Sequence, residues 1–172
     1  MADYLENHEE KKIDSIAWYK SRLHEGFRYK DYLAWGEGIR VEMLGGMVYL
    51  MASPTVWHQR MVLGLGRQLD DFFNNKPCKP FIAPLDVRLF PQDDLCDTTV
   101  VQPDVLVVCD ESKIDRKGIF GAPDFIIEIM SEYSEGHDKI TKRKLYEQAG
   151  VREYWIVAED KICAPIPGCN FI

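Results

Sequence analysis

The sequence predicts an α/β domain in which helices pack against a mixed β-sheet, and three features of its second half support this. Two apolar runs, Val105–Cys109 and Phe125–Met130, are continuous rather than alternating, as expected of strands buried on both faces. A segment with helical spacing, Asp138–Ala149, follows and ends at Gly150, a residue that favours helix C-termini. A further apolar strand, Tyr154–Val157, comes next, so the helix forms a crossover between two buried strands.

The first part of the chain predicts two helices and a hairpin. We expect helices at 14–24 and 27–35, the second anchored by aromatic and apolar side chains. The strands Arg40–Leu44 and Met47–Met51 are expected to form a hairpin, because the glycine pair 45–46 between two apolar strands is typical of tight turns.

A long helix is expected after the hairpin, beginning at Ser53-Pro54 and ending at Asn74 or Asn75. Serine suits the N-cap and proline the first turn. His58 lies beside an apolar stripe on this helix, and both a hydrogen-bonded core histidine and a catalytic base remain open for it. The stripe has helical spacing and consists of Trp57, Met61, Leu65, Leu69 and Phe72.

One more strand is expected at Phe81–Phe90, with Asp86 and Arg88 as its polar members. An acidic loop, 91–99, follows it. A polar loop, 110–121, separates the two buried strands of the second half.

Length and composition fit one domain over 1–172, with 1–12 disordered and an atypical C-terminal segment at 158–172. The 172 residues suffice for one hydrophobic core, and 46% of them are hydrophobic, as in globular proteins. No apolar run is long enough to span a bilayer, and the polar N-terminus has no signal-peptide pattern. We therefore expect no membrane partner and a cytoplasmic location.

Cysteine usage and charge limit the chemistry. The five cysteines contain no CxxC pair, which favours reduced structural thiols over a zinc site. The formal net charge of −7 weighs against broad, sequence-independent binding of nucleic acid, which depends on Lys and Arg. A small basic island within 138–152 is either a local site or a solvated helix face.

Two carboxylates lie in or beside the predicted buried strands. Glu128 is flanked by isoleucines, where an acidic side chain is costly to bury unless a metal ion or a cation pairs with it. Asp104 starts the other strand, where an aspartate can also simply end a turn. Mg²⁺ is usually held by one or two carboxylates. Asp104 and Glu128 are thus candidate ligands, and Glu42 and Asp86 are candidates for further ligands or supporting groups.

A cation is also needed near a scissile phosphate or an attacking water, and Lys142 is the candidate. Asp138, Lys142 and Tyr146 are spaced four apart and share one helix face, which could lie over the ends of the acidic strands. The plain alternatives are a surface ion pair between Asp138 and Lys142, and a core position for Tyr146.

These residues belong to a longer pattern, from about 27 to 157, that resembles a known family. The pattern resembles a bacterial family of candidate restriction endonucleases, formerly a domain of unknown function, in the PD-(D/E)XK nuclease superfamily. Its parts are Arg40–Gly46, Ser53-Pro54 with His58, Pro84–Leu89, Gln102–Asp104, Ala122–Ser131, Asp138 with Lys142, and Glu153–Val157.

The resemblance implies a restriction-endonuclease-like mixed β-sheet flanked by α-helices. It also implies that Asp104 and Glu128 are the two acids of the superfamily motif. Met130 stands where the motif lysine is usual, and the resemblance implies that Lys142 takes its place. Glu42 matches an acid near the site in relatives. After Val157 prolines and a glycine replace the usual strand, so an edge strand is expected to be missing or replaced.

Two functions follow as hypotheses. The first is an Mg²⁺-dependent endonuclease, with Mn²⁺ as a substitute metal, that hydrolyses DNA phosphodiester bonds. Its candidate catalytic residues are Asp104, Glu128, Lys142 and Glu42, and its candidate metal ligands are Asp104, Glu128 and Asp86. The resemblance further implies a homodimer, because two sites cut two strands. The second hypothesis is a catalytically silent binding or assembly protein that keeps the nuclease fold, as Met130 and the negative charge suggest.

Overall fold

The computed structural model describes residues 26–35, 40–130, 137–158 and 162–163. The helix expected at 14–24 and the disorder expected at 1–12 lie outside these residues. Over the described ranges, no helix combines the length and the apolar character that a membrane span requires.

The strands within the described residues form two five-stranded mixed sheets where one was expected. The α/β class and the flanking helices are as predicted. Each sheet is mixed, because one pair of neighbours in it is parallel and the others are antiparallel. In order across the sheet, the first consists of β2 (Met47–Leu50), β1 (Val41–Leu44), β5 (Val100–Val101), β4 (Val87–Arg88) and β7 (Ile119–Phe120). The second consists of β10 (Ile162–Cys163), β9 (Glu153–Val157), β8 (Phe125–Ile129), β6 (Val105–Val108) and β3 (Lys79–Ile82).

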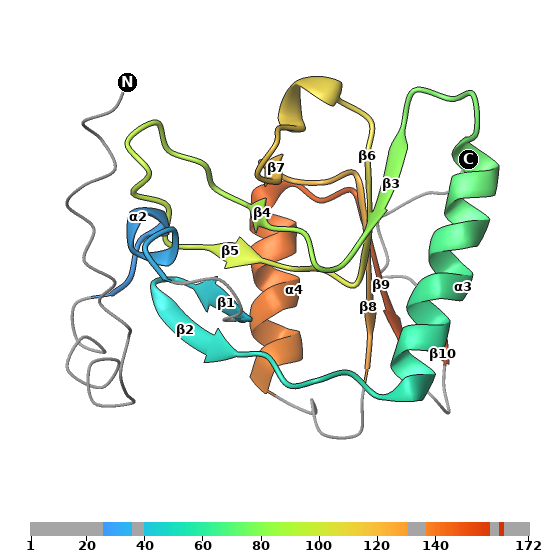
Figure 1. Ribbon diagram of the computed structural model, residues 1–172, viewed down its shortest axis with the longest axis horizontal. Helices are drawn as coiled ribbons and strands as arrows, with labels where there is room; N and C mark the ends of the chain where they lie inside the picture. The colour runs from blue at the N-terminus through green and yellow to red at the C-terminus, as the bar shows by residue number, and fades with distance from the viewer. Residues whose placement is uncertain (1–25, 36–39, 131–136, 159–161, 164–172) are drawn as a thin grey trace, which may run out of the picture.

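The second sheet is enclosed between two helices. In Figure 1, β6 and β8 stand between α4 (His137–Ala149) and α3 (Val56–Phe73). The crossover prediction is confirmed, since α4 connects β8 to the parallel strand β9. Gly150 ends α4 with a φ of 88°, a conformation that glycine adopts without strain. On the α4 side, Tyr146 packs into a core that includes Leu106 and Ile126.

The α3 helix begins two residues later than expected. Thr55, not Ser53, is its N-cap, and the Thr55 hydroxyl accepts a hydrogen bond from the backbone N–H of His58 at 3.1 Å. Most of the predicted stripe packs against the second sheet, but Phe72 is 59% exposed. Val62, outside the predicted stripe, is the buried residue of this helix.

The strand predicted at Phe81–Phe90 is wrong as a single element. Residues 79–82 form β3 of the second sheet, whereas Val87 and Arg88 form β4 of the first. Pro84 lies between them and has no backbone N–H to donate to a sheet ladder, so the pairing ends there.

Shorter elements complete the described chain. The helix expected at 27–35 is the single turn α2 (Tyr29–Tyr32), and the hairpin of β1 and β2 has the predicted Gly45-Gly46 turn. The loop expected at 110–121 contains a 3-10 turn, η1 (Glu111–Lys113), and β7. The C-terminal segment still supplies an edge strand, because β10 pairs with β9 over two residues.

The expectation of reduced thiols is wrong for two cysteines. Cys78 and Cys109 form a disulfide bond. Lys79 pairs with Val108 in antiparallel register, so the next pair outward is Cys78 opposite Cys109. The two cysteines are 31 residues apart in sequence and meet because β3 pairs with β6, which no local motif indicates. Cys96 is a free thiol.

Candidate functional site

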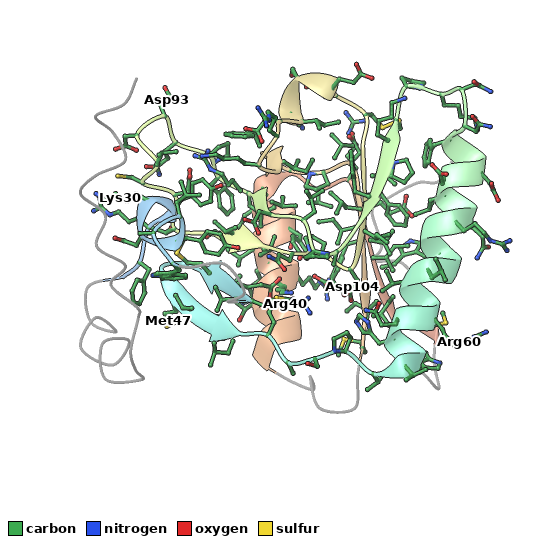
Figure 2. All side chains as sticks on the ribbon, viewed as in Figure 1. Lys30, Arg40, Met47, Arg60, Asp93 and Asp104 are labelled. Atoms are coloured by element: carbon green, nitrogen blue, oxygen red, sulfur yellow. A yellow bond between two sulfur atoms is a disulfide. The ribbon has the colours of Figure 1, made fainter. Side chains whose placement is uncertain are left out.

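A cleft of about 730 Å³ opens where the β1–β2 hairpin, the start of α3 and the ends of β6 and β8 meet. In Figure 2, Arg40 and Asp104 lie between the hairpin and α3, and both line this cleft. Four of the five predicted catalytic or metal-binding residues also line it, namely Asp104, Glu128, Lys142 and Glu42. Asp86 is the one that does not.

The two acids of the predicted motif meet through strand pairing. Val105 pairs with Ile127 in the antiparallel register of β6 and β8, so one step further places Asp104 opposite Glu128. Asp104 lies just outside β6 and reaches α3, whereas Glu128 is within β8 and contacts α4. The acids therefore sit at the end of the strand pair, between the two helices.

Glu128 is a buried carboxyl group held from the α4 side. The Tyr146 hydroxyl donates to its Oε1 at 2.6 Å, and the Lys142 ammonium donates to the same oxygen at 3.2 Å. Burial raises the pKa of Glu128 to about 7, although the charge of Lys142 and the Tyr146 hydrogen bond act in the opposite direction. Desolvation is therefore the larger effect, and the carboxyl is only partly ionised near neutral pH.

Lys142 lies between two carboxylates that come from different sheets. Its Nζ is 2.8 Å from Oε1 and from Oε2 of Glu42, in addition to its contact with Glu128. Burial opposes the charge of the Lys142 ammonium, but the charges of Glu128 and Glu42 outweigh it and raise the pKa of Lys142. The side chain thus remains a cation at the cleft.

A second hydrogen-bonded chain reaches the site from the first sheet. The Gln102 backbone N–H donates to Glu42 Oε1 at 2.8 Å, and the Gln102 side-chain amide donates to Asp86 Oδ1 at 2.8 Å. The Tyr32 hydroxyl donates to the same Asp86 oxygen at 2.8 Å. Burial and the Asp86 charge together raise the pKa of Tyr32. Asp86 is therefore connected to Glu42 through Gln102 instead of facing the cleft.

Asp104 is held by two donors on one oxygen. Its Oδ2 accepts the backbone N–H of Ile129 at 2.7 Å and lies 3.1 Å from Nε2 of His58. The hydrogen bond to Asp104 raises the pKa of His58, while burial of the imidazole lowers it to a smaller extent. Of the two readings left open by the sequence, the structure shows a hydrogen-bonded histidine, and its partner is a candidate metal ligand.

The donor set fits a hard divalent cation such as Mg²⁺. Within the described ranges, Oδ1 of Asp104 and Oε2 of Glu128 have no hydrogen-bond donor, so each carboxylate has one open oxygen. Both oxygens of Glu42 already contact Lys142. The described residues hold no group of three or more His, Cys, Asp and Glu side chains suited to a metal. A cation here would therefore be held by the two carboxylates, with water and substrate as its other ligands.

Three residues that contribute to the candidate site were missed or only partly anticipated from the sequence. Tyr146 is the core residue expected, but its hydroxyl also binds Glu128. Gln102 supplies two hydrogen bonds, and Arg40 brings a positive charge to the cleft lining. The sequence signals available for Gln102 were its place directly before a proline and a candidate acid, and its part in the family resemblance. The side chain of Asp138 lies outside the described part of the structure.

Comparisons with known proteins agree with this architecture. The family model described as "Putative restriction endonuclease" matches residues 29–163. A solved structure described as "a putative nuclease belonging to DUF820" from Anabaena variabilis ATCC 29413 is similar, with a TM-score of 0.61 and 21% identity. The match covers 78% of this chain and 75% of that one, and it shows a common fold. A search of curated proteins gave no match.

Proposed function

The chain belongs to the family described as "Putative restriction endonuclease", and from this premise we propose that it is an Mg²⁺-dependent endonuclease that hydrolyses DNA phosphodiester bonds. Mn²⁺ is expected to substitute for Mg²⁺. The observation that carries the proposal is the convergence of Asp104, Glu128 and Lys142 on one cleft, although they come from three separate segments of the chain.

The role of each acidic residue follows from which of its carboxylate oxygens already contact a donor and which do not. Asp104 and Glu128 would hold the metal through the oxygens that have no donor among the described residues. The bound metal supplies an activated water and stabilises charge on the phosphate. Lys142 has three N–H donors, which contact Glu42 and Glu128, and it would turn the donor on Glu128, its longest contact at 3.2 Å, to a phosphate oxygen or to the attacking water. Glu42 then acts by holding the ammonium in place.

A contact with nucleic acid would be confined to the cleft and would depend on the bound metal. The chain has a formal net charge of −7, which disfavours tight non-specific binding along a DNA backbone. The cleft lining contains two cations, Arg40 and Lys142, beside the three acids, so a divalent cation held by Asp104 and Glu128 would be needed to offset the acids next to a phosphate. We also propose a homodimer, because a cut through both strands of a duplex needs two such sites. Analytical ultracentrifugation with and without duplex DNA tests the dimer separately.

The test combines metal binding with cleavage. End-labelled single-stranded and duplex DNA, and RNA of the same sequence, are incubated with Mg²⁺, Mn²⁺, Ca²⁺ or EDTA. We expect DNA cleavage with Mg²⁺ and Mn²⁺, its loss in Asp104→Asn and Glu128→Gln, and no loss in Glu147→Gln, which alters an exposed acid on α4. Failure to cleave any substrate, together with no Mn²⁺ binding in calorimetry, would overturn the proposal.

One observation favours a second function, a catalytically silent binding or assembly protein. With Glu128 protonated, the charges of Glu42 and Lys142 balance, so the cluster is neutral without any metal. Buried ion clusters of this kind also occur as structural features. Glu128→Ala separates the two functions. A silent protein would keep its stability and bind no Mn²⁺ before or after the change, whereas an enzyme would lose Mn²⁺ binding.

A further inference from the structure

The Asp104 carboxylate is oriented by two donors, and one of them is a side chain to which the proposed mechanism gives no role. We propose that His58 is a positioning residue, which donates from Nε2 to Oδ2 of Asp104 and thereby directs Oδ1 toward the metal. This inference rests on the proposed function, because it concerns the same metal site.

Both donors to Asp104 contact the same carboxylate oxygen, Oδ2. Nε2 of His58 lies 3.1 Å from Oδ2, and the two side chains are 14% and 13% exposed. The backbone N–H of Ile129 reaches the same Oδ2 at 2.7 Å. Two donors from different elements, α3 and β8, therefore restrain the rotation of the carboxylate and leave Oδ1 as the oxygen without a donor in the described structure. A carboxylate fixed in this way loses less conformational freedom when it binds a cation.

The backbone holds both donors in place. His58 is in the first turn of α3, where its own N–H binds the Thr55 cap at 3.1 Å. Ile129 directly follows Glu128 in β8. The start of α3 and the end of β8 therefore meet at Asp104, and the orientation of one candidate ligand is tied to the strand that carries the other.

The surroundings of Nδ1, the other imidazole nitrogen of His58, indicate whether this residue positions Asp104 or transfers a proton. Nδ1 of His58 is buried and has no hydrogen-bond partner among the described residues. A proton on Nδ1 would be a buried donor without an acceptor, which is costly. In the neutral ring the proton therefore belongs on Nε2, and the imidazolium, which the contact with Asp104 favours, carries a proton on Nε2 as well, so both forms donate to Asp104. Nε2 faces Asp104 and Nδ1 is buried, so neither nitrogen is placed to take a proton from a substrate.

The experiment compares variants that keep or remove the donor. In His58→Gln the amide nitrogen lies about as far along the side chain as Nε2, whereas His58→Leu removes the donor. Mn²⁺ affinity is measured by calorimetry, kcat and KM for DNA cleavage by gel assay, and folding by circular dichroism. Gln68→Leu is the matched control, because it removes an exposed side-chain hydrogen bond to Gly64 from the same helix.

We expect His58→Leu to weaken Mn²⁺ affinity by about 10- to 100-fold, as is usual when the partner of a metal ligand is removed. His58→Gln should retain most of the affinity, and Gln68→Leu should match the wild type. The loss should appear in kcat at sub-saturating metal and leave KM for DNA unchanged. Equal Mn²⁺ affinities of His58→Leu and wild type would overturn the positioning role alone, as would a His58→Gln variant as weak as His58→Leu. No Mn²⁺ binding or cleavage by the wild type would overturn the proposed function as well.

A measurement on the unaltered protein covers the case in which His58→Leu does not fold. Proton–nitrogen correlation spectra of ¹⁵N-histidine protein at alkaline pH report which ring nitrogen carries the proton, and the His58 signals are assigned by their absence in His58→Gln. We expect the proton on Nε2. A proton on Nδ1 would overturn the proposal, because Nε2 could not then donate to Asp104.

Discussion

The ammonium group of Lys142 lies 2.8 Å from the Glu42 carboxylate, and this ion pair joins parts of the chain 100 residues apart. Glu42 belongs to the first sheet, whereas Lys142 is on the helix that covers the second. The pair therefore fixes the cation relative to Glu128 and, at the same time, connects the two halves of the fold across the cleft.

Lys142→Met is expected to abolish most cleavage and to destabilise the protein. Loss of a preorganised donor at a developing charge usually lowers kcat by about 10²- to 10³-fold. Removing the ammonium also leaves Glu42 buried without its cation, which costs about 3 kcal/mol in the free energy of unfolding. Single-turnover cleavage and urea unfolding measure the two effects. Lys144→Met, on the exposed side of α4, should change neither. Full activity in Lys142→Met would remove the lysine from the mechanism.

The metal-free protein is expected to lose stability as the pH rises through the range in which Glu128 ionises. The pKa of Glu128 is raised in the folded state from 4.5 to about 7. Between these values the folded state binds more protons than the unfolded state, so the free energy of unfolding falls with rising pH. The decline should amount to at most about 3 kcal/mol between about pH 5 and pH 8.

Urea unfolding at several pH values measures this decline in the presence of EDTA. Glu128→Gln should flatten it, because the amide does not ionise. Mg²⁺ should restore stability at the alkaline end, since a bound cation favours the ionised carboxylate. A pH dependence identical in wild type and Glu128→Gln would assign the decline to another group.

Much of the fold and the acidic pair could be predicted because the signals are local. The runs 105–109 and 125–130 are apolar at every position but one, which identifies buried strands without knowledge of their partners. Glu128 stood out because it is the exception within such a run. Helical spacing and the resemblance together predicted Lys142 as the cation of the site, and its Nζ lies 3.2 Å from Oε1 of Glu128.

The remaining features depend on contacts between distant segments. The segment 81–90 was predicted as one strand although Pro84 is a local signal against it, and its two halves join different sheets, which the sequence does not indicate. The disulfide requires the register of β3 against β6. The hydrogen bonds of Gln102 to Glu42 and Asp86 likewise cross between strands. Sequence periodicity contains no information about such partners.

Reduction of the Cys78–Cys109 bond should lower stability without affecting cleavage. The bond closes a loop with a sequence separation of 31 residues, for which the chain-entropy model gives about 3–4 kcal/mol. It lies at one end of the β3–β6 pair, whereas Ala83 and Asp104, which line the cleft, lie at the other. Thermal unfolding of Cys78→Ser/Cys109→Ser against wild type measures the loss, and the cleavage rate is the control. A large fall in kcat would contradict this separation.

Asp86→Asn should reduce stability but leave Mn²⁺ affinity nearly unchanged, if Asp86 supports the site and does not bind the metal. Its Oδ1 accepts from both Tyr32 and Gln102, and it is not part of the cleft lining. Loss of these charge-assisted hydrogen bonds should cost about 1–3 kcal/mol in the free energy of unfolding. Calorimetric titration with Mn²⁺ is the decisive measurement. A loss of affinity as large as that of Asp104→Asn would instead identify Asp86 as a ligand.

Tyr146→Phe should move the acidic limb of the pH–rate profile to higher pH. The Tyr146 hydroxyl donates to Glu128 at 2.6 Å, and this hydrogen bond lowers the pKa of a carboxyl group that burial raises. Without the donor, the pKa of Glu128 should rise further, so a larger fraction is protonated and unable to bind a metal near neutral pH. Tyr154→Phe is the matched control, because Tyr154 packs beside Tyr146 and its hydroxyl makes no hydrogen bond among the described residues. Cleavage rates measured across the pH range at a fixed, sub-saturating Mg²⁺ concentration should show the displacement in Tyr146→Phe alone, because saturating metal would hold Glu128 ionised in every variant. If both variants keep the wild-type limb, the ionisation that controls cleavage does not belong to Glu128.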